Sequence, residues 1–130
     1  MGIGDRGKRI YVALSNFYGI PTAAGSAGFG AAFDPETAAD PNGAIDLGPL
    51  TVANGVVYAG SMAGTATSPN MLALDVATGK TLWSFAAGAS VIAGATVVDG
   101  IVYRGAGYRH LGIPGFTGST HFYAFSPGGK

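Results

Sequence analysis

The side chains that could do chemistry in this sequence are few, and they stand apart from one another. His110 and His121 are the two histidines, and no third metal ligand lies near them in the sequence, so they do not predict a metal site. The run from Asp40 to Asp46 spaces oxygen atoms somewhat like a calcium loop. It lacks the late bidentate glutamate of an EF-hand, and we interpret it as a Pro-Asn-Gly turn.

Other catalytic and binding motifs fail on context or are absent. Gly2 to Gly7 spells G-x-G-x-x-G, but a nucleotide-binding loop joins a strand to a helix, and here a strand is expected to follow. There is no G-x-S-x-G elbow, and the absence of cysteine excludes disulfides and thiolate metal sites. The motifs therefore identify no catalytic residue.

Composition narrows the partners and the fold class. Seven Lys and Arg residues balance seven Asp and Glu residues and are scattered, which predicts no nucleic-acid partner. No apolar run is long enough to span a bilayer, and no signal peptide is visible behind the charged start MGIGDRGKR. The 23 glycines and the low charge of 11% favour an all-β protein with many tight turns.

An internal repeat organises the chain. The segments Lys8–Ala13, Asn54–Gly60 and Asp99–Gly105 align on their tyrosines, and a second set of segments follows them at Ala31, Leu72 and Tyr123. A period of roughly 45 residues is typical of four-stranded β-propeller blades. The best-preserved unit, Gly48 to Phe85, predicts four antiparallel strands joined by Asn-Gly and Thr-Gly-Lys turns. Its expected strands are Leu50–Ala53, Val56–Ser61, Met71–Asp75 and Thr81–Phe85.

The flanking units are incomplete. The third unit has strands around Val97, at Ile101–Gly105 and at His121–Ser126, with no fourth strand. The first unit lacks its opening strand, and after Thr37 it lacks the expected turn and Trp-bearing strand. The predicted fold is all-β, a partial propeller with one complete blade and two partial ones. Its boundaries are 1–47 for the eroded blade, 48–85 for the complete blade and 86–130 for the blade without its outer strand.

One segment carries a family resemblance. Ala73 to Trp83 reads A-x-D-x-x-T-G-K-x-x-W, which resembles the tryptophan-docking motif of the quinoprotein alcohol dehydrogenases, eight-bladed propellers that bind pyrroloquinoline quinone (PQQ). The flanking words GPLTVANGVVYAGSM and FYAFS are similar to the C-terminal part of polyvinyl-alcohol-dehydrogenase-like proteins. The sequence departs from this pattern at Arg104, where the family usually has an aromatic residue.

The motif also has a physical interpretation. Asp75 can accept backbone N–H groups across the turn, and Gly79 can take the left-handed conformation that closes it. Ala73 and Thr78 complete the pattern. Trp83 could stack on a cofactor, but its place in the motif favours packing between blades, where such a side chain buries on the order of 150–250 Å².

The resemblance implies a function for the intact protein. That protein would oxidise secondary alcohols with PQQ and calcium in the periplasm or outside the cell, with a cytochrome c as electron acceptor. The cofactor face of such a propeller would include Asp46, Ser61 and Arg109, although a plain polar rim is the alternative. This chain, as a C-terminal fragment, is expected to be inactive alone and to bind no cofactor. The rival hypothesis is a non-enzymatic propeller that acts as a protein-binding or assembly scaffold.

The incomplete third unit also predicts how the chain associates. This unit stops after its third strand, at Phe125–Ser126, where a closed ring would add a fourth strand, so we expect an exposed edge. The partners would be the remaining blades of the parent protein or further copies of the same chain.

Overall fold

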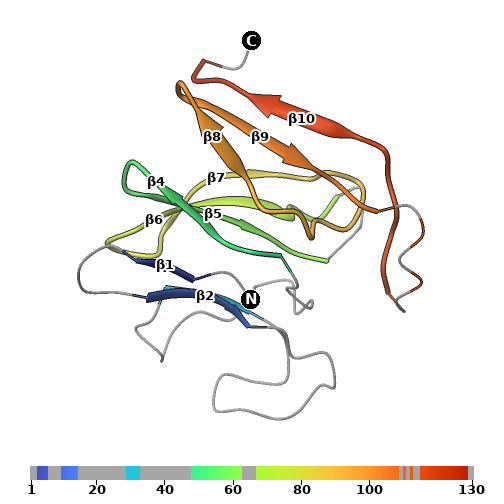
Figure 1. Ribbon diagram of the computed structural model, residues 1–130, viewed down its shortest axis with the longest axis horizontal. Coiled ribbons are helices and arrows are strands. Elements are labelled where there is room, and N and C mark those ends of the chain that lie inside the picture. Colours follow the sequence, from blue (N-terminus) through green and yellow to red (C-terminus); the bar gives the residue numbers. More distant parts are fainter. Residues whose placement is uncertain are drawn as a thin grey trace.

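The computed structural model describes residues 3–5, 10–14, 29–32, 48–62, 67–108, 110, 112 and 115–128. In these ranges the chain is all-β, with ten strands in three antiparallel sheets and no helix (Figure 1). None of the described residues therefore belongs to a helix able to cross a membrane. The three sheets are separate, and together they form no closed barrel.

Each sheet follows the chain in simple up-and-down order. The first sheet contains β1 (Ile3–Asp5), β2 (Ile10–Leu14) and β3 (Phe29–Ala32). The second contains β4 (Thr51–Ala53), β5 (Val56–Gly60), β6 (Met71–Asp75) and β7 (Thr81–Phe85). The third contains β8 (Thr96–Val98), β9 (Ile101–Gly105) and β10 (Phe122–Phe125). The described residues after β10 form no further strand.

The first sheet corrects one prediction. The sequence suggests that the first unit lacks its opening strand, but Ile3–Asp5 forms β1 and pairs antiparallel with β2, with Ile3 opposite Val12. The segment has Gly4 at its centre, and glycine has a low intrinsic preference for strands. The ladder to β2 overrides that local preference.

A two-residue turn joins the first two strands of the second sheet, and another joins the first two strands of the third sheet. Asn54 and Gly55 have φ angles of 51° and 81°, and Asp99 and Gly100 have φ angles of 50° and 77°. Positive φ at both central residues is the signature of a type I′ turn, whose twist matches that of the flanking strands. The Asn-Gly and Asp-Gly pairs therefore fix where β4 and β5, and β8 and β9, reverse.

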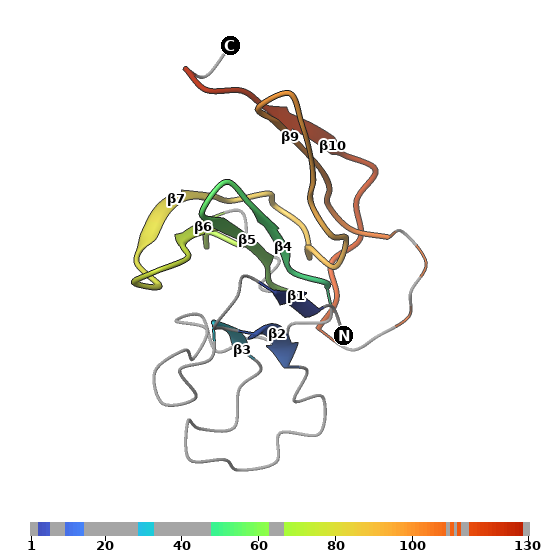
Figure 2. The same ribbon diagram turned by 60° about the vertical axis from the view of Figure 1, so that its left-hand side comes forward.

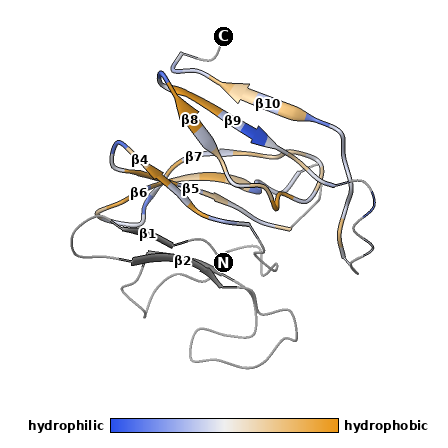
Figure 3. Cartoon of the chain, in the orientation of Figure 1, coloured by the Kyte–Doolittle hydropathy of each residue, from blue (hydrophilic) through white to orange (hydrophobic). Residues whose placement is uncertain are grey.

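The sheets stack face to face, with β4–β7 in the middle (Figure 2). One face of this middle sheet forms a core around Leu50, Val57 and Ala59, on the side where β1 lies next to β4. Its other face packs Met71 and Phe85 against β10 and the segment that connects β7 to β8. Figure 3 shows the apolar strands that supply both faces. Alternation of side chains along each strand gives the middle sheet two apolar faces, and each contributes to a core.

Candidate functional site

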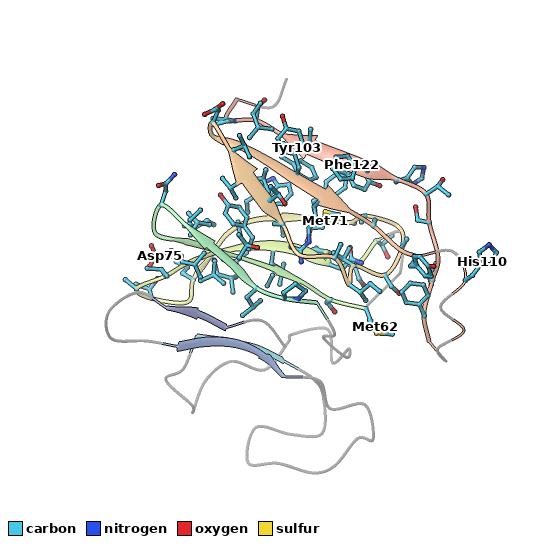
Figure 4. The ribbon with its side chains drawn as sticks, in the orientation of Figure 1. Met62, Met71, Asp75, Tyr103, His110 and Phe122 are labelled. Carbon is cyan, nitrogen blue, oxygen red and sulfur yellow. The ribbon has the colours of Figure 1, made fainter. Side chains whose placement is uncertain are left out.

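Three connections leave the stacked sheets at one end, which we call the loop end. Their described residues are 61–62 and 67–70 between β5 and β6, 86–95 between β7 and β8, and 106–108, 110, 112 and 115–121 between β9 and β10. The tight turns lie at the opposite end, so Met62 and His110 are far from Asp75 in Figure 4. Loops that gather on a rigid scaffold are the usual place for binding groups. The loop end is therefore the candidate site.

Asn70 organises the interior of the loop end. Its side chain is fully buried, and its Nδ2 donates a hydrogen bond to the carbonyl of Ala89 at 2.6 Å. Its Oδ1 accepts the backbone N–H of Ala87 at 3.0 Å. One amide thus pairs with two backbone groups of the β7–β8 connection, whose polar atoms would otherwise be buried without these partners.

Ser90 holds the other two connections together. Its hydroxyl donates to the Met62 carbonyl at 3.0 Å and accepts the N–H of Thr117 at 2.9 Å. Its backbone N–H donates to the Thr117 carbonyl, and its carbonyl accepts the N–H of Gly107. The fully buried Ser90 of the β7–β8 connection is therefore hydrogen-bonded to both of the other connections of the loop end.

The three predicted cofactor contacts differ in what the structure says of them. Ser61 is only 1% exposed, and its backbone bonds to Asn70 and Val91. Asp46 and Arg109 lie outside the described residues. Ser61 thus has an interior position and a visible structural role. Contact of any of these three residues with a cofactor stays a prediction.

The solvent-facing part of the loop end is a shallow pocket of about 370 Å³. Its polar groups come from Ser119, Thr120, His121 and Tyr123, and the Tyr123 hydroxyl donates to the Ala87 carbonyl at 3.1 Å. The described residues of the loop end include no carboxylate, and no group of three metal-ligating residues occurs in the described part of the chain. Hydroxyl and imidazole groups suit hydrogen bonding to a polar molecule. They do not match the carboxylate oxygens that calcium prefers.

The predicted docking motif forms a turn at the opposite end. One carboxylate oxygen of Asp75 accepts the N–H of Ala77 at 3.1 Å, the N–H of Thr78 at 2.8 Å and the Thr78 hydroxyl at 2.7 Å. The Thr78 hydroxyl, followed by the backbone N–H groups, holds the pKa of Asp75 below its ordinary value of 3.8. Gly79 has a φ angle of 71°, as the left-handed position requires.

Trp83 connects this turn to the next sheet. Its ring meets the ring of Phe125 edge-on, with centroids 4.7 Å apart, and stacks beside Phe85 at 6.0 Å. Phe85 in turn contacts Tyr123 and Phe125 edge-on at 5.1 and 5.2 Å. Ala73 lies opposite Trp83 in the β6–β7 ladder. The aromatic residues of β7 thus pack on those of β10, in geometries that aromatic pairs favour.

Arg104 adds a polar link across the same pair of sheets. It is 3% exposed, and its guanidinium donates from Nε to the Ala93 carbonyl at 3.0 Å and from Nη1 to the Ala59 carbonyl at 2.6 Å. A side chain on Gly60 would overlap this guanidinium. Sequence reasoning noticed Arg104 only as a departure from the family pattern. The glycine that makes room for it is the signal that could have suggested its role.

Comparison with known proteins does not assign the chain to a family. No protein-family model matches the sequence, and a search of curated proteins finds no significant match.

Proposed function

We propose that this chain forms consecutive blades of a β-propeller of the quinoprotein alcohol dehydrogenase type, and that it supplies blade packing rather than a reactive centre. The observation that carries the proposal is the contact between Trp83 and Phe125, which joins one repeat sheet to the next. The Asp75 turn that presents Trp83 has the hydrogen bonds that the docking motif predicts. The repeat order and the stacked sheets also support this proposal.

The chemical activity belongs to the intact protein in this proposal. There, PQQ and calcium would support oxidation of a secondary alcohol, with a cytochrome c as electron acceptor and a periplasmic or secreted location. This part of the proposal rests on the sequence resemblance. The described loop end supplies no carboxylate for a calcium ion or a general base, so we assign it no reaction step.

A scaffold without enzymatic activity is the second candidate. It is favoured by the way the buried polar groups of the loop end are used. Asn70 and Ser90 direct their side chains to loop-to-loop hydrogen bonds, as groups that maintain a shape would. Such a protein would have the same stacked sheets and would present its loops to another protein.

A turnover assay tests the packing role. The purified chain would be mixed with PQQ, calcium and a secondary alcohol, and reduction of an electron-accepting dye would be followed. We expect no dye reduction above that of the cofactor alone, because the described loop end has no carboxylate. Saturable, alcohol-dependent turnover by this chain would overturn the proposal that it acts only in packing.

Fluorescence tests the packing contact itself. Trp83 is the single tryptophan, so its emission reports on its environment without interference from another indole. Trp83 is already 39% exposed, and Phe125→Ala should shift its emission further to longer wavelength, because the indole loses the ring that covers one side of it. Phe122→Ala is the matched control, since Phe122 belongs to the same strand but to its opposite face. An unchanged spectrum in Phe125→Ala would contradict the packing contact.

A further inference from the structure

The same face of two consecutive sheets is covered in one and open in the other. In β4–β7 the face includes Thr51, Tyr58 and Ala73, which pair directly across the strands, and the neighbouring pair Gly60 and Met71. We call this the receiving face. Trp83 and Phe85 stand on this face as well, since they pair with Ala73 and Met71. Both rings contact Phe125 of β10, so β8–β10 packs on the receiving face.

Specific contacts show how the receiving face of β4–β7 is covered. The Thr51 hydroxyl donates to the Ala95 carbonyl at 2.6 Å, just before β8 begins. The guanidinium of Arg104 passes over Gly60. Met71 is only 1% exposed to solvent, and Ala73 is only 6% exposed. Three features therefore define this interface. They are a threonine hydroxyl that bonds across it, a glycine that leaves space for a side chain of the next sheet, and an apolar residue beside that glycine.

All three features recur in β8–β10. Its corresponding rows contain Thr96, Tyr103 and Ala124, and then Gly105 and Phe122. Thr96 is exposed, and a side chain atom added at Gly105 would find no neighbour closer than 3.9 Å. The apolar residue beside this glycine is Phe122, whose ring stacks with that of Tyr103 at 6.3 Å between centroids (Figure 4). The third sheet thus repeats the receiving face of the second.

This second receiving face is open and uncharged. Phe122 is 71% exposed and Val98 is 51% exposed. Met71, which occupies the position of Phe122 in the second sheet, is buried. No Lys, Arg, Asp or Glu stands in the rows that form the face. Exposed apolar surface of this kind marks an interaction site. The receiving face of the preceding sheet is covered by a repeat sheet. The open face of β8–β10 should therefore also bind a sheet of the same repeat.

We infer that a second copy of the chain supplies this sheet, so that copies stack head to tail. The sheets β1–β3 and β8–β10 lie on opposite sides of β4–β7 (Figure 2), which leaves one at each end of the stack. In β1–β3 the directly paired positions Ile3, Val12 and Ala31 are apolar residue types, and the next pair on the same face is Asp5 with Ile10, at the edge strand. The chain carries no net charge that would oppose association. This inference rests on the proposed repeat-packing function.

Head-to-tail contact has a consequence for assembly size. Each copy would use one surface to bind its neighbour and a different surface to be bound. Such heterologous contacts build rings or open filaments rather than two-fold dimers. The protein should therefore form species larger than a dimer, and their share should grow with concentration.

Sedimentation velocity over a wide range of concentration tests this inference. The wild-type chain should show growth beyond the dimer, and Phe122→Asp should abolish it, because a carboxylate would have to be buried in an apolar contact. Thr96→Lys, a milder change on the exposed end of the same face, should weaken it as well. Leu82→Asp is the control, since Leu82 is 56% exposed on β7 outside the receiving face, and it should leave assembly intact.

The outcomes separate this inference from the proposed function. A wild-type monomer at all concentrations, a dimer that grows no further, or assembly that survives Phe122→Asp would each overturn head-to-tail stacking. A monomer would instead assign the open face to a further sheet of a longer protein. The Trp83 emission reports on packing within the chain in the same samples. If that emission were insensitive to Phe125→Ala, the proposed function would fail, whatever the assembly state.

Discussion

The two ends of the stacked sheets are stabilised in different ways. At the turn end, Asn54-Gly55, Asp99-Gly100 and the Asp75 turn close each hairpin through residues next to one another in the chain. At the loop end, Asn70 bonds to Ala87 and Ala89, and Ser90 bonds to Met62 and Thr117. The first end depends on local backbone preferences, and the second depends on hydrogen bonds between distant segments.

This difference determines what a substitution does at each end. A turn residue acts mainly on its own hairpin, and it is partly in contact with water. A buried polar residue at the loop end has partners that cannot turn to water when it is removed, so the loss of a single side chain leaves several polar atoms unsatisfied. Substitutions at the loop end should therefore destabilise the fold more than substitutions at the turn end.

The largest effect is expected for Asn70→Ala. The substitution removes both side-chain hydrogen bonds to the β7–β8 connection and leaves a buried N–H and a buried carbonyl without them. At about 1–3 kcal/mol for each unsatisfied group, we expect a loss of about 3 kcal/mol in the free energy of unfolding. Urea denaturation followed by Trp83 fluorescence measures it. Ser84→Ala, at an exposed position of β7, should change the stability by less than about 0.5 kcal/mol. Equal effects of the two substitutions would contradict the difference between the ends.

An intermediate effect is expected from a matched pair of glycines. Gly60→Ala places a methyl group against the Arg104 guanidinium and the Val91 side chain, and should cost about 1–3 kcal/mol through overpacking. Gly105→Ala, at the equivalent position of the next sheet, meets nothing closer than 3.9 Å within the chain and should be close to neutral in samples dilute enough to be monomeric. Thermal unfolding of the two variants compares them directly. A destabilising Gly105→Ala together with a neutral Gly60→Ala would place the interface between the sheets on the wrong face.

The smallest effect belongs to the turn end and depends on pH. The folded pKa of Asp75 is lowered, chiefly by the Thr78 hydroxyl, so the ionised carboxylate stabilises the fold. This contribution is complete above the ordinary pKa of 3.8 and is lost as the pH falls through the lowered folded pKa. Asp75→Asn should therefore lower the stability modestly near neutrality, where the carboxylate contribution is complete, and its difference from the wild type should shrink as the pH falls below about 4. If the acid unfolding profile of Asp75→Asn matched that of the wild type, the carboxylate would have no such role.

Sequence patterns predicted the features that depend on neighbouring residues. The strands at Val56, Thr81 and Ile101 follow from β-branched and aromatic residues, and the strand at Met71 follows from its place in the repeat. The Asn-Gly and Asp-Gly pairs predicted the turns that have type I′ φ angles. Asp75 carries its own signal, because an Asx turn needs only the residues that follow it.

The missed features depend on contacts far along the chain. Strand β1 exists through its pairing with β2, and its own residues include a glycine. Asn70 stands after a proline in a polar loop, where nothing local shows that Ala87 and Ala89 come within reach of its amide. Arg104 looks like an exposed charge in an apolar strand, and only the stacking of two sheets brings Ala59 and Ala93 to its guanidinium. Tertiary packing decided each of these three cases.

A double-mutant cycle on Trp83 and Phe125 tests the central claim, that repeat sheets are joined through this aromatic contact. Unfolding would be followed by far-ultraviolet circular dichroism, since the single tryptophan is removed in two of the variants. The contact predicts a coupling energy of about 0.5–1.5 kcal/mol between Trp83→Ala and Phe125→Ala. The same cycle with Phe122→Ala, on the open face, should give a coupling close to zero. Additive effects of Trp83→Ala and Phe125→Ala would contradict the claim.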